Sequence, residues 1–265
     1  LGREPVWIDN SLLSNALSGK AVMVTGAGGS IGAELCRQIA QFRPALLVAY
    51  EQNEYFLYKL QEEFTVSFPE VQVISVAGDI KDPVRVDQVM RQYAPTVVFH
   101  AAAYKHVPLM EDLNAWEAVR NNVLGTFTVA RAAVAHGAEE FVLVSTDKAV
   151  NPTNVMGATK RLAEMICQAM MRASGSTRFE MVRFGNVLGS AGSVIPKFQE
   201  QIERGGPVTI THPDLDAPVR LSSDPTQRLS HDPLTYGTVS RGETYPFVLV
   251  SVVIPDERKG SPPAS

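Results

Sequence analysis

The sequence has little cysteine and no long apolar run. Its two cysteines, Cys36 and Cys167, lie far apart, and each falls within an apolar pattern of helical period. A disulfide framework needs more cysteines, so we interpret both as small core residues of a protein in a reducing compartment. No apolar run approaches the ~20 residues of a membrane span, and no signal peptide is present. These features predict a cytoplasmic protein with no membrane span in this chain, and Leu1 at its start indicates a piece of a longer protein.

Positive charge is also scarce. The chain has 24 Lys and Arg against 28 Asp and Glu, a net charge of -4, and no basic run. Proteins that bind DNA or RNA need a cationic face for the phosphates, so nucleic acid is not the expected main partner. We assign no metal site. With 265 residues and 45% hydrophobic content, the chain can build one large domain or one domain plus part of a second.

A glycine cluster follows the first apolar run. Residues 21–24 have the pattern of a buried parallel strand, residues 25–32 (Thr-Gly-Ala-Gly-Gly-Ser-Ile-Gly) form a turn, and residues 33–42 have helical period. Glycines let the backbone approach a pyrophosphate, and the start of the helix offers free N–H groups and a positive dipole end. We therefore assign cofactor contacts to Gly26, Gly28, Gly29, Ser30, Ile31 and Gly32.

An acid ends the next predicted strand, about 20 residues beyond the turn. Residues 45–49 are apolar, and Tyr50 and Glu51 follow them. A carboxylate at this position accepts hydrogen bonds from a ribose diol and repels a 2′-phosphate, which favours NAD over NADP. The alternative is that Glu51 only caps the helix that starts near Asn53.

The rest of the chain alternates strands and helices. Further strands are predicted at 71–76, 96–100, 141–144 and 178–184, and helices at 53–64, 82–93, 110–135 and 156–171. This alternation is typical of an α/β fold with a doubly wound parallel sheet. Helical spacing over 53–64 predicts a buried face that includes Tyr55 and Tyr58. Asp79 and Ile80 follow the third strand, where an adenine edge could be bound.

The segment after the fourth strand combines small and polar residues. Ala101, Ala102 and Ala103 leave room for a flat ligand on the cofactor side, or they simply pack tightly. His100 alone is more often a core histidine than a catalyst. Lys105 and His106 could meet an anionic substrate or only water. Asn122 interrupts an apolar helical pattern, so we expect its side chain to bond to neighbouring loop backbone and to position the cofactor side.

The most informative stretch is 144–161. Thr146, Asp147 and Lys148 stand where a buried strand opens into a loop, the edge at which ligands bind in parallel sheets. An acid beside a base is a candidate proton-transfer pair, although a solvated ion pair in a turn is the alternative. Met156 and Lys160, four residues apart on the next helix, share one face.

After the sixth strand, a second glycine loop at 185–193 and a helix at 194–204 could hold a diphosphate, with Lys197 nearby.

The motifs at 25–32, 79–80, 100–108, 145–160 and 183–190 resemble the extended short-chain dehydrogenase/reductases. Within that superfamily they look like the bacterial UDP-N-acetylglucosamine 4,6-dehydratases of polysaccharide and glycan biosynthesis. Most members have Tyr-x-x-x-Lys, whereas this chain has Met156 at the tyrosine position. That substitution resembles the large, membrane-anchored branch, whose catalytic domain would face the cytoplasm at the inner membrane.

The resemblance implies a redox-neutral reaction in which bound NAD oxidises C4 of the sugar, water is lost across C5 and C6, and the hydride returns to C6. By analogy, Lys148 is the base, Asp147 the acid, and Thr146 polarises the C4 oxygen. Such roles need a lowered lysine pKa and a raised aspartate pKa, so we expect no tight salt bridge between the two side chains in the working state. Lys160 would bind the nicotinamide ribose, and substrate contacts fall to Lys105, His106, Asn186, Ser193 and Lys197.

The resemblance covers residues 1–214 and then stops. We therefore divide the chain into a lead-in segment (1–19), an NAD-binding domain with the start of a substrate lobe (20–214) and an atypical tail (215–265). A reading-frame shift in the source gene near residue 215 is our hypothesis for the tail, much of which has a disorder-like composition. Alternatives to the dehydratase are a sugar-nucleotide 4-epimerase or reductase and an NAD-binding module without turnover. A homo-oligomer is possible for any of them.

Overall fold

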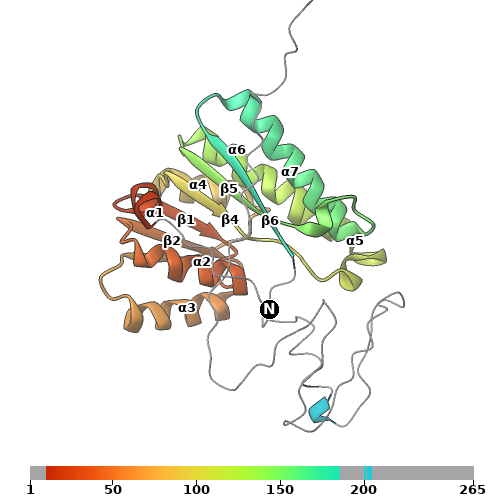
Figure 1. The fold of residues 1–265 in the computed structure, drawn as a ribbon, viewed down its shortest axis with the longest axis horizontal. Coiled ribbons are helices and arrows are strands. Elements are labelled where there is room, and N and C mark those ends of the chain that lie inside the picture. Colours follow the sequence, from red (N-terminus) through yellow and green to blue (C-terminus); the bar gives the residue numbers. More distant parts are fainter. Residues whose placement is uncertain (1–9, 186–199, 201, 205–265) are drawn as a thin grey trace, which may run out of the picture. The chain divides into compact units, whose positions relative to one another are not determined.

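The computed structural model describes residues 10–185, 200 and 202–204. Its centre is a sheet of six parallel strands in the order β3-β2-β1-β4-β5-β6 (Figure 1). The strands are β1 Ala21–Thr25, β2 Leu46–Glu51, β3 Val73–Ala77, β4 Val97–His100, β5 Glu140–Thr146 and β6 Arg178–Phe184. The strand order reverses between β1 and β4, which is the switch point of a doubly wound sheet. The predicted fold class is confirmed.

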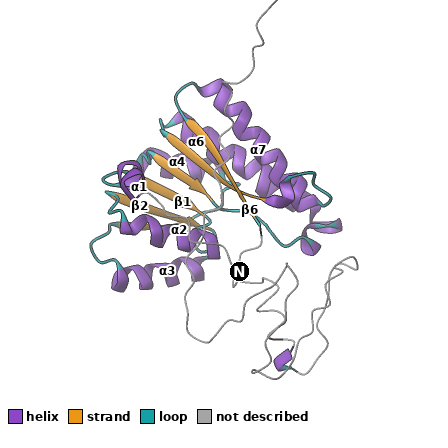
Figure 2. Ribbon diagram, in the orientation of Figure 1, coloured by secondary structure: helices purple, strands orange, loops and turns teal. Residues whose placement is uncertain are grey.

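Helices cover both faces of the sheet (Figure 2). Alternation along the strands divides the apolar side chains: Met23 and Val48 pack with α4 and α6, while Val22 and Leu47 pack with α2 and α3. The main helices are α1 Asn10–Leu17, α2 Ser30–Gln41, α3 Glu54–Ser67, α4 Pro83–Tyr93, α6 Thr126–Ala135 and α7 Val155–Ser174.

Local capping fixes where these helices begin and end. The Asn53 side chain accepts from Phe56 N at the start of α3, and Asp82 accepts from the backbone at the start of α4, whose first residue is a proline. Asn154 accepts from Gly157 N at 2.8 Å at the start of α7. That helix ends at Gly175, which has φ +62. The Asn154 cap and Gly175 therefore define the two ends of α7.

Two predictions about helices were wrong. The single helix predicted over 110–135 is instead η1 Pro108–Met110, η2 Asp112–Asn114, α5 Ala115–Ala118, the π-helical segment η3 Val119–Gly125, and α6. On α3, Leu57 and Leu60 are buried as expected, but Tyr55 and Tyr58 are 58% and 51% exposed. The tyrosines lie beside the line of buried residues on α3 rather than within it. The leucines cover the sheet, and the tyrosines face solvent.

Several predictions about the interior agree with the structure. Cys36 and Cys167 are buried free thiols. Burial raises the pKa of each to about 12, so both stay protonated and behave as apolar core atoms. Leu17 of α1 is buried among the residues under α2 and α3. In the described part of the chain, no helix has the length and apolar character needed to cross a membrane.

Other predictions lie outside the described residues. They concern the glycine loop beyond Gly185, the tail, and the substrate candidates Asn186, Ser193 and Lys197. Of the helix predicted over 194–204, the described residues 202–204 form a turn of helix and its end. The domain boundaries at 19 and 214 stay predictions.

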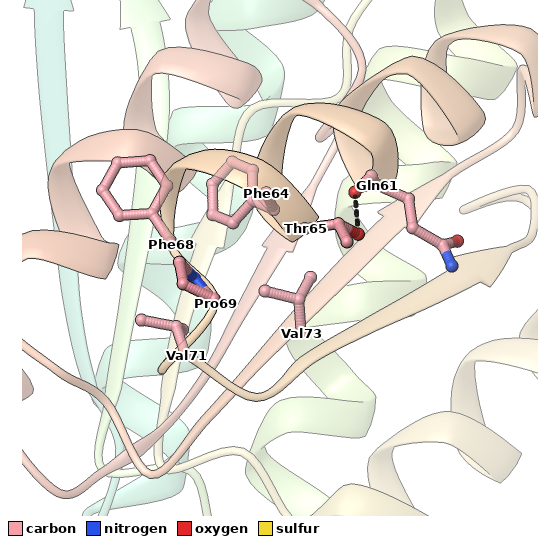
Figure 3. A pocket seen from close by; sticks show the side chains of 7 residues that line it. All are labelled: Gln61, Phe64, Thr65, Phe68, Pro69, Val71 and Val73. Carbon is pink, nitrogen blue, oxygen red and sulfur yellow. Dashed lines mark hydrogen bonds between the residues drawn. The ribbon is translucent and has the colours of Figure 1, made fainter.

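A hollow between α3 and β3 is lined by mostly apolar side chains (Figure 3). It lies beside the end of α3 and the beginning of β3, and Thr65 Oγ1 donates to the Gln61 carbonyl at 2.8 Å along its rim. The lining residues are Gln61, Phe64, Thr65, Phe68, Pro69, Val71 and Val73. Because β3 begins here, the hollow belongs to the amino edge of the sheet, opposite the edge at which parallel sheets bind ligands.

Candidate active site

The glycine turn begins where β1 ends. Gly26 has φ +69, and a Cβ there would lie 2.7 Å from Ala102 Cα, so only glycine allows this approach. The tight packing that was one interpretation of the three alanines is therefore observed at Ala102. α2 starts at Ser30, earlier than the predicted residue 33, with Gly29 as its N-cap. Ser30, Ile31 and Gly32 thus form the first turn of the helix, at its positive dipole end.

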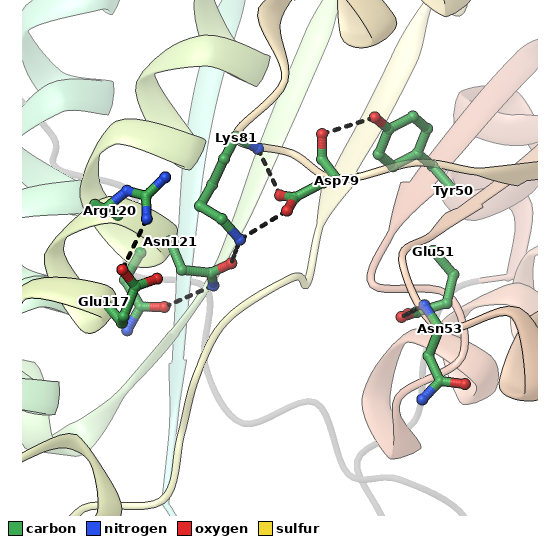
Figure 4. A network of polar contacts seen from close by, with 9 residues as sticks. Tyr50, Glu51, Asn53, Asp79, Lys81, Glu117, Arg120 and Asn121 are labelled. Atoms are coloured by element: carbon green, nitrogen blue, oxygen red, sulfur yellow. Dashed lines mark hydrogen bonds and ion pairs between the residues drawn. The ribbon is translucent and has the colours of Figure 1, made fainter. Parts of the chain in front are cut away.

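Glu51 ties this turn to the second strand. Its carboxylate accepts from Gly28 N at 3.1 Å and from Asn53 N at 2.9 Å, and Figure 4 shows the second of these bonds. A Cβ on Gly28 would lie 2.5 Å from Phe56 Cβ and 3.0 Å from Glu51 Cγ. The alternative role of Glu51, bonding the backbone that leads into α3, is thus observed. The ribose contact stays a prediction.

Asp79 is held by a basic neighbour. Lys81 donates to it twice, from its backbone N to Oδ1 and from Nζ to Oδ2, both at 2.8 Å (Figure 4). Tyr50 Oη donates to the Asp79 carbonyl at 2.9 Å, and Ile80 is buried beneath the turn. Lys81 Nζ also reaches Asn121 Oδ1 at 3.4 Å. The turn after β3 is therefore fixed from two sides.

His100, at the end of β4, is fully buried between two threonines. Thr126 Oγ1 donates to the Asn122 carbonyl at 2.7 Å, so it accepts from His100 Nε2–H at 3.0 Å. The other ring nitrogen, Nδ1, then accepts from Thr25 Oγ1 at 2.7 Å. Burial, with a smaller contribution from the charge of Lys160, lowers the pKa of His100 to about 3. The imidazole is a neutral, fully bonded core group, as the sequence favoured.

Asn122 fastens the loop after β4 to α7. Its Oδ1 accepts from Tyr104 N at 2.8 Å, and its Nδ2 donates to Tyr104 O and to Thr159 Oγ1, both at 3.0 Å. The side chain is completely buried. The predicted bond between Asn122 and neighbouring loop backbone is confirmed, whereas its role toward a cofactor stays a prediction.

Thr146, Asp147 and Lys148 form a polar group at the end of β5. Lys148 Nζ lies 3.1 Å from Asp147 Oδ1, and Thr146 Oγ1 donates to the same oxygen at 2.9 Å. Partial burial alone would raise the pKa of Asp147, but the hydrogen bonds from Thr146 and Lys148 outweigh it and hold the pKa below its ordinary value. The predictions of a raised aspartate pKa and of no tight ion pair concern the working state and stay predictions; in this structure both side chains are partly exposed and bonded to each other.

Met156 and Lys160 share a buried face of α7, as predicted. Met156 packs with Met110 and Ala118. Lys160 is 4% exposed, and its Nζ donates to the Val144 carbonyl at 2.7 Å. Burial lowers the pKa of Lys160 to about 8. Its ammonium group thus lies directly under the end of β5.

Glu164 belongs to the site but was not predicted. Its carboxylate is 1% exposed and binds Ser145 of β5, Arg183 of β6 and Arg161 of its own helix. The sequence carried one signal: an acid one turn beyond Lys160, in phase with the apolar residues Ala163 and Cys167. A buried carboxylate on such a face needs partners.

The remaining candidates are dispersed. Lys105 and His106 are exposed on the loop after β4, and partial burial lowers the pKa of Lys105. Among the described residues, His, Cys, Asp and Glu side chains nowhere gather in threes as a metal site would require.

Residues 22–217 match the family described as "Polysaccharide biosynthesis protein". Over 216 residues the chain is 50% identical to the capsular polysaccharide biosynthesis protein CapD of Staphylococcus aureus. This match covers 81% of the chain and 36% of CapD. It is 34% identical to a UDP-N-acetylglucosamine 4,6-dehydratase (inverting) of Campylobacter jejuni and 36% identical to a UDP-glucose 4-epimerase of Rickettsia rickettsii, covering 58% and 57% of their lengths. The chain thus spans about a third to three fifths of these relatives.

Solved structures with the same fold include Pen from Bacillus thuringiensis, with a TM-score of 0.68, 36% identity, and coverage of 74% of this chain and 61% of Pen. Another is a UDP-glucose 4-epimerase from Brucella ovis in complex with NAD, with a TM-score of 0.54, 25% identity, and coverage of 63% and 52%. The sheet order, the glycine turn and these matches agree. This chain belongs to the polysaccharide biosynthesis protein family, whose fold is that of the extended short-chain dehydrogenase/reductases.

Proposed function

We propose that this chain carries the catalytic site of an NAD-dependent 4,6-dehydratase that acts on UDP-N-acetylglucosamine. The observation that supports it most directly is the acid and base side by side at the end of β5, 3.1 Å apart. Loss of water across C5 and C6 needs a base for the C5 proton and an acid for the C6 hydroxyl, whereas C4 epimerisation needs no acid at C6. The Campylobacter relative bears the name of this activity.

The residues at the end of β1 fit NAD. Gly26 and Gly28 are packed so closely against Ala102 and Phe56 that no side chain could stand there, so the backbone turns tightly from β1 into α2, whose positive N-terminal end suits a pyrophosphate. When bound, NAD supplies reversible oxidation at C4 of the sugar. In this proposal residues 26–32 bind the pyrophosphate, Glu51 the adenosine ribose, and Lys160 the nicotinamide ribose. Asp79 and Ile80 bind the adenine, with Ala101 to Ala103 and Asn122 shaping the wall beside the cofactor.

The observed ion pair can be converted into the working pair by one proton transfer. Catalysis needs a neutral Lys148 and a protonated Asp147, which is the observed pair with a proton moved along the Nζ–Oδ1 hydrogen bond. The net charge does not change. Substrate that covers these half-exposed groups excludes water, and burial lowers a lysine pKa while raising an aspartate pKa, so covering favours the neutral pair.

Lys148 then takes the C5 proton, which the neighbouring 4-keto group makes acidic, and Asp147 protonates the C6 hydroxyl as it leaves as water. Protonation of Asp147 also weakens its hold on the Thr146 hydroxyl, which becomes available to donate to the C4 oxygen. Met156 has no dissociable proton and cannot perform that task. In this proposal Lys105, His106, Asn186, Ser193 and Lys197 bind the rest of the nucleotide sugar.

A sugar-nucleotide 4-epimerase is the second candidate, because the Rickettsia relative bears that name at 36% identity. The products differ: dehydration lowers the mass by one water, whereas epimerisation leaves it unchanged. In heavy water, the proton lost from C5 is replaced from solvent, so a dehydration product carries deuterium there and an epimer does not. A module that binds NAD without turnover is the third candidate. It is favoured by Met156, which stands where most members of the superfamily have a tyrosine.

The test is incubation of the purified chain with UDP-N-acetylglucosamine and NAD, followed by mass spectrometry of the nucleotide sugars. We expect a product lighter by one water, abolished by Asp147→Asn and by Lys148→Ala. The matched controls are Lys59→Ala and Glu62→Gln. These two residues form an exposed ion pair on α3, and its N–O distance of 3.0 Å is close to the 3.1 Å between Lys148 and Asp147. Both controls should keep full turnover.

A product of unchanged mass would replace the proposal with the epimerase. Bound NAD without any product, also with other UDP-sugars, would favour the non-catalytic module. Loss of turnover in the Lys59 or Glu62 variant would show that the Asp147 and Lys148 variants fail for reasons unrelated to proton transfer.

A further inference from the structure

We propose that Glu164 is a positioning residue that holds the ends of β5 and β6 in the arrangement needed for proton transfer by Asp147 and Lys148. The inference rests on the proposed function for its catalytic consequence. Its structural part, the control of the β5 end by one buried carboxylate, can be tested without turnover.

The Glu164 carboxylate accepts four hydrogen bonds from three side chains. Oε1 accepts from Ser145 Oγ and from Arg183 Nε, both at 2.7 Å. Oε2 accepts from Arg183 Nη2 at 2.5 Å and from Arg161 Nη1 at 2.9 Å. The two bonds from Arg183 form a planar, bidentate pair, the arrangement that best fixes direction as well as distance. These bonds outweigh burial and hold the pKa of Glu164 below its ordinary value, so it binds as a carboxylate.

Glu164 therefore joins two neighbouring strands at their next-to-last residues. Ser145 and Arg183 are paired across β5 and β6, and the next pair, Thr146 and Phe184, completes the ladder. Beyond it, β5 leads directly into Asp147 and Lys148. One turn before Glu164 on α7, Lys160 holds the Val144 carbonyl. Three consecutive residues of β5 are thus fixed: Val144 by Lys160, Ser145 by Glu164, and Thr146 by its bonds to the Asp147–Lys148 turn.

A buried ion pair is weak evidence for a stabilising role, because removing it from water costs about as much as the attraction gains. Its position is more informative. The same two strands carry a second Glu–Arg pair at their beginning, where Arg178 Nη2 donates to Glu140 Oε1 at 2.6 Å. That pair is at the amino edge and more exposed, with side-chain exposures of 62% and 19%. Only the pair at the carboxyl edge adds a bond to the residue before the candidate catalytic group.

In Glu164→Gln, an amide donor group would face donors of Arg183 or Ser145, so the bidentate pair cannot form. We expect turnover by Glu164→Gln to fall about 10-fold to 100-fold, because a displacement of catalytic groups by a fraction of an ångström has effects of this size. The KM for NAD should stay within about twofold, since the proposed NAD contacts lie mainly after β1 and β2. Ser145→Ala, which keeps both arginine pairs, should give a smaller fall in turnover and serves if Glu164→Gln does not fold.

The second readout is hydrogen exchange of the amides of Lys148 and Val150, which donate to Thr146 Oγ1 at 3.3 Å and to the Asp147 carbonyl at 3.0 Å. We expect exchange at both to speed up about 10-fold in Glu164→Gln, and to a lesser extent in Ser145→Ala, with little change in Glu140→Gln. The control has the same chemistry on the same strands at the opposite edge.

Unchanged exchange in Glu164→Gln, or equal acceleration in Glu140→Gln, would overturn the proposal whatever the turnover. Faster exchange with unchanged turnover in an active enzyme would also overturn it, since the carboxylate would then fix the loop without serving catalysis. If the wild-type chain makes no product, the proposed function fails separately, and the exchange comparison still decides whether Glu164 controls the end of β5.

Discussion

The buried imidazole of His100 makes the fold sensitive to mild acid. In the folded protein both ring nitrogens are bonded to threonine hydroxyls, and the pKa is lowered to about 3 from 6.5. As the pH falls below 6.5, the unfolded chain takes up a proton that the folded chain refuses. The stability that comes from the neutral imidazole is therefore complete above pH 6.5 and is lost progressively between pH 6.5 and about pH 3.

The size of the effect follows from the shift. Each pKa unit corresponds to about 1.4 kcal/mol. Because the loss begins near the unfolded pKa of 6.5, about 1.5 pH units contribute between pH 7 and pH 5. Over this range His100 should lower the free energy of unfolding by about 2 kcal/mol. Carboxylates contribute little over this range because their unfolded pKa values lie near 4. At pH 5 the loss is a substantial part of the ~5–15 kcal/mol by which domains are stable.

Urea unfolding of the whole chain at pH 7 and pH 5, followed by far-ultraviolet circular dichroism, measures this loss. His100→Asn removes the titrating group, so we expect its unfolding free energy to change by about 2 kcal/mol less than that of the wild type between the two pH values. Phe141→Leu is the control, because Phe141 packs beside His100 with ring centroids 5.7 Å apart and does not titrate. If His100→Asn keeps the wild-type pH dependence, the imidazole does not resist protonation and the description of the β4 end is wrong.

Three further predictions concern the cofactor side of the sheet. Glu51→Gln should narrow the preference for NAD over NADP about 10-fold in binding titrations, since the carboxylate that repels a 2′-phosphate is removed; an unchanged ratio would leave Glu51 only its role before α3. Asn122→Asp replaces the donor to Tyr104 O by an acceptor and should lower the unfolding free energy by about 2–4 kcal/mol, whereas a change within 0.5 kcal/mol would contradict the observed bonds. Burial lowers the pKa of Lys160 to about 8, so below this pH the buried positive charge destabilises the fold. The free energy of unfolding should therefore rise as the pH increases from 8 to 10.5, and Lys160→Met should abolish this rise, measured by thermal unfolding across the range.

The sheet and the glycine turn could be predicted because their signals are local. Buried parallel strands are short apolar runs, and the cluster at 25–32 lies between a strand and a helix, where several glycines indicate a tight turn. The polar edge at Thr146 was likewise placed by the end of an apolar run. For this reason the six strands, and the position of Thr146 at the end of β5, agree with the sequence even where helix starts differ by a few residues.

The features that escaped prediction depend on contacts between distant segments. The pKa of Asp147 is set by which way two neighbouring side chains turn, and sequence does not record that choice. Glu164 takes partners from β5, β6 and α7, so its role appears only when the two strands are paired. The error at Tyr55 has a local cause instead: it lies two residues before Leu57, about 200° away around the helix, so it faces away from the buried side of α3.

The π-helical segment η3 can be regarded as a one-residue insertion in a helix that would otherwise run on into α6. The insertion lets two adjacent asparagines point inward, which an α-helix does not favour for neighbours separated by about 100°. Asn121 bonds to the turn after β3 through Lys81, and Asn122 bonds to the loop after β4 and to α7. We expect that deleting one residue from η3 would restore a regular α-helix. Either Asn121 or Asn122 would then turn away from its present bonding partners. A single extra backbone unit thus mechanically links the adenine end of the proposed site to its catalytic end.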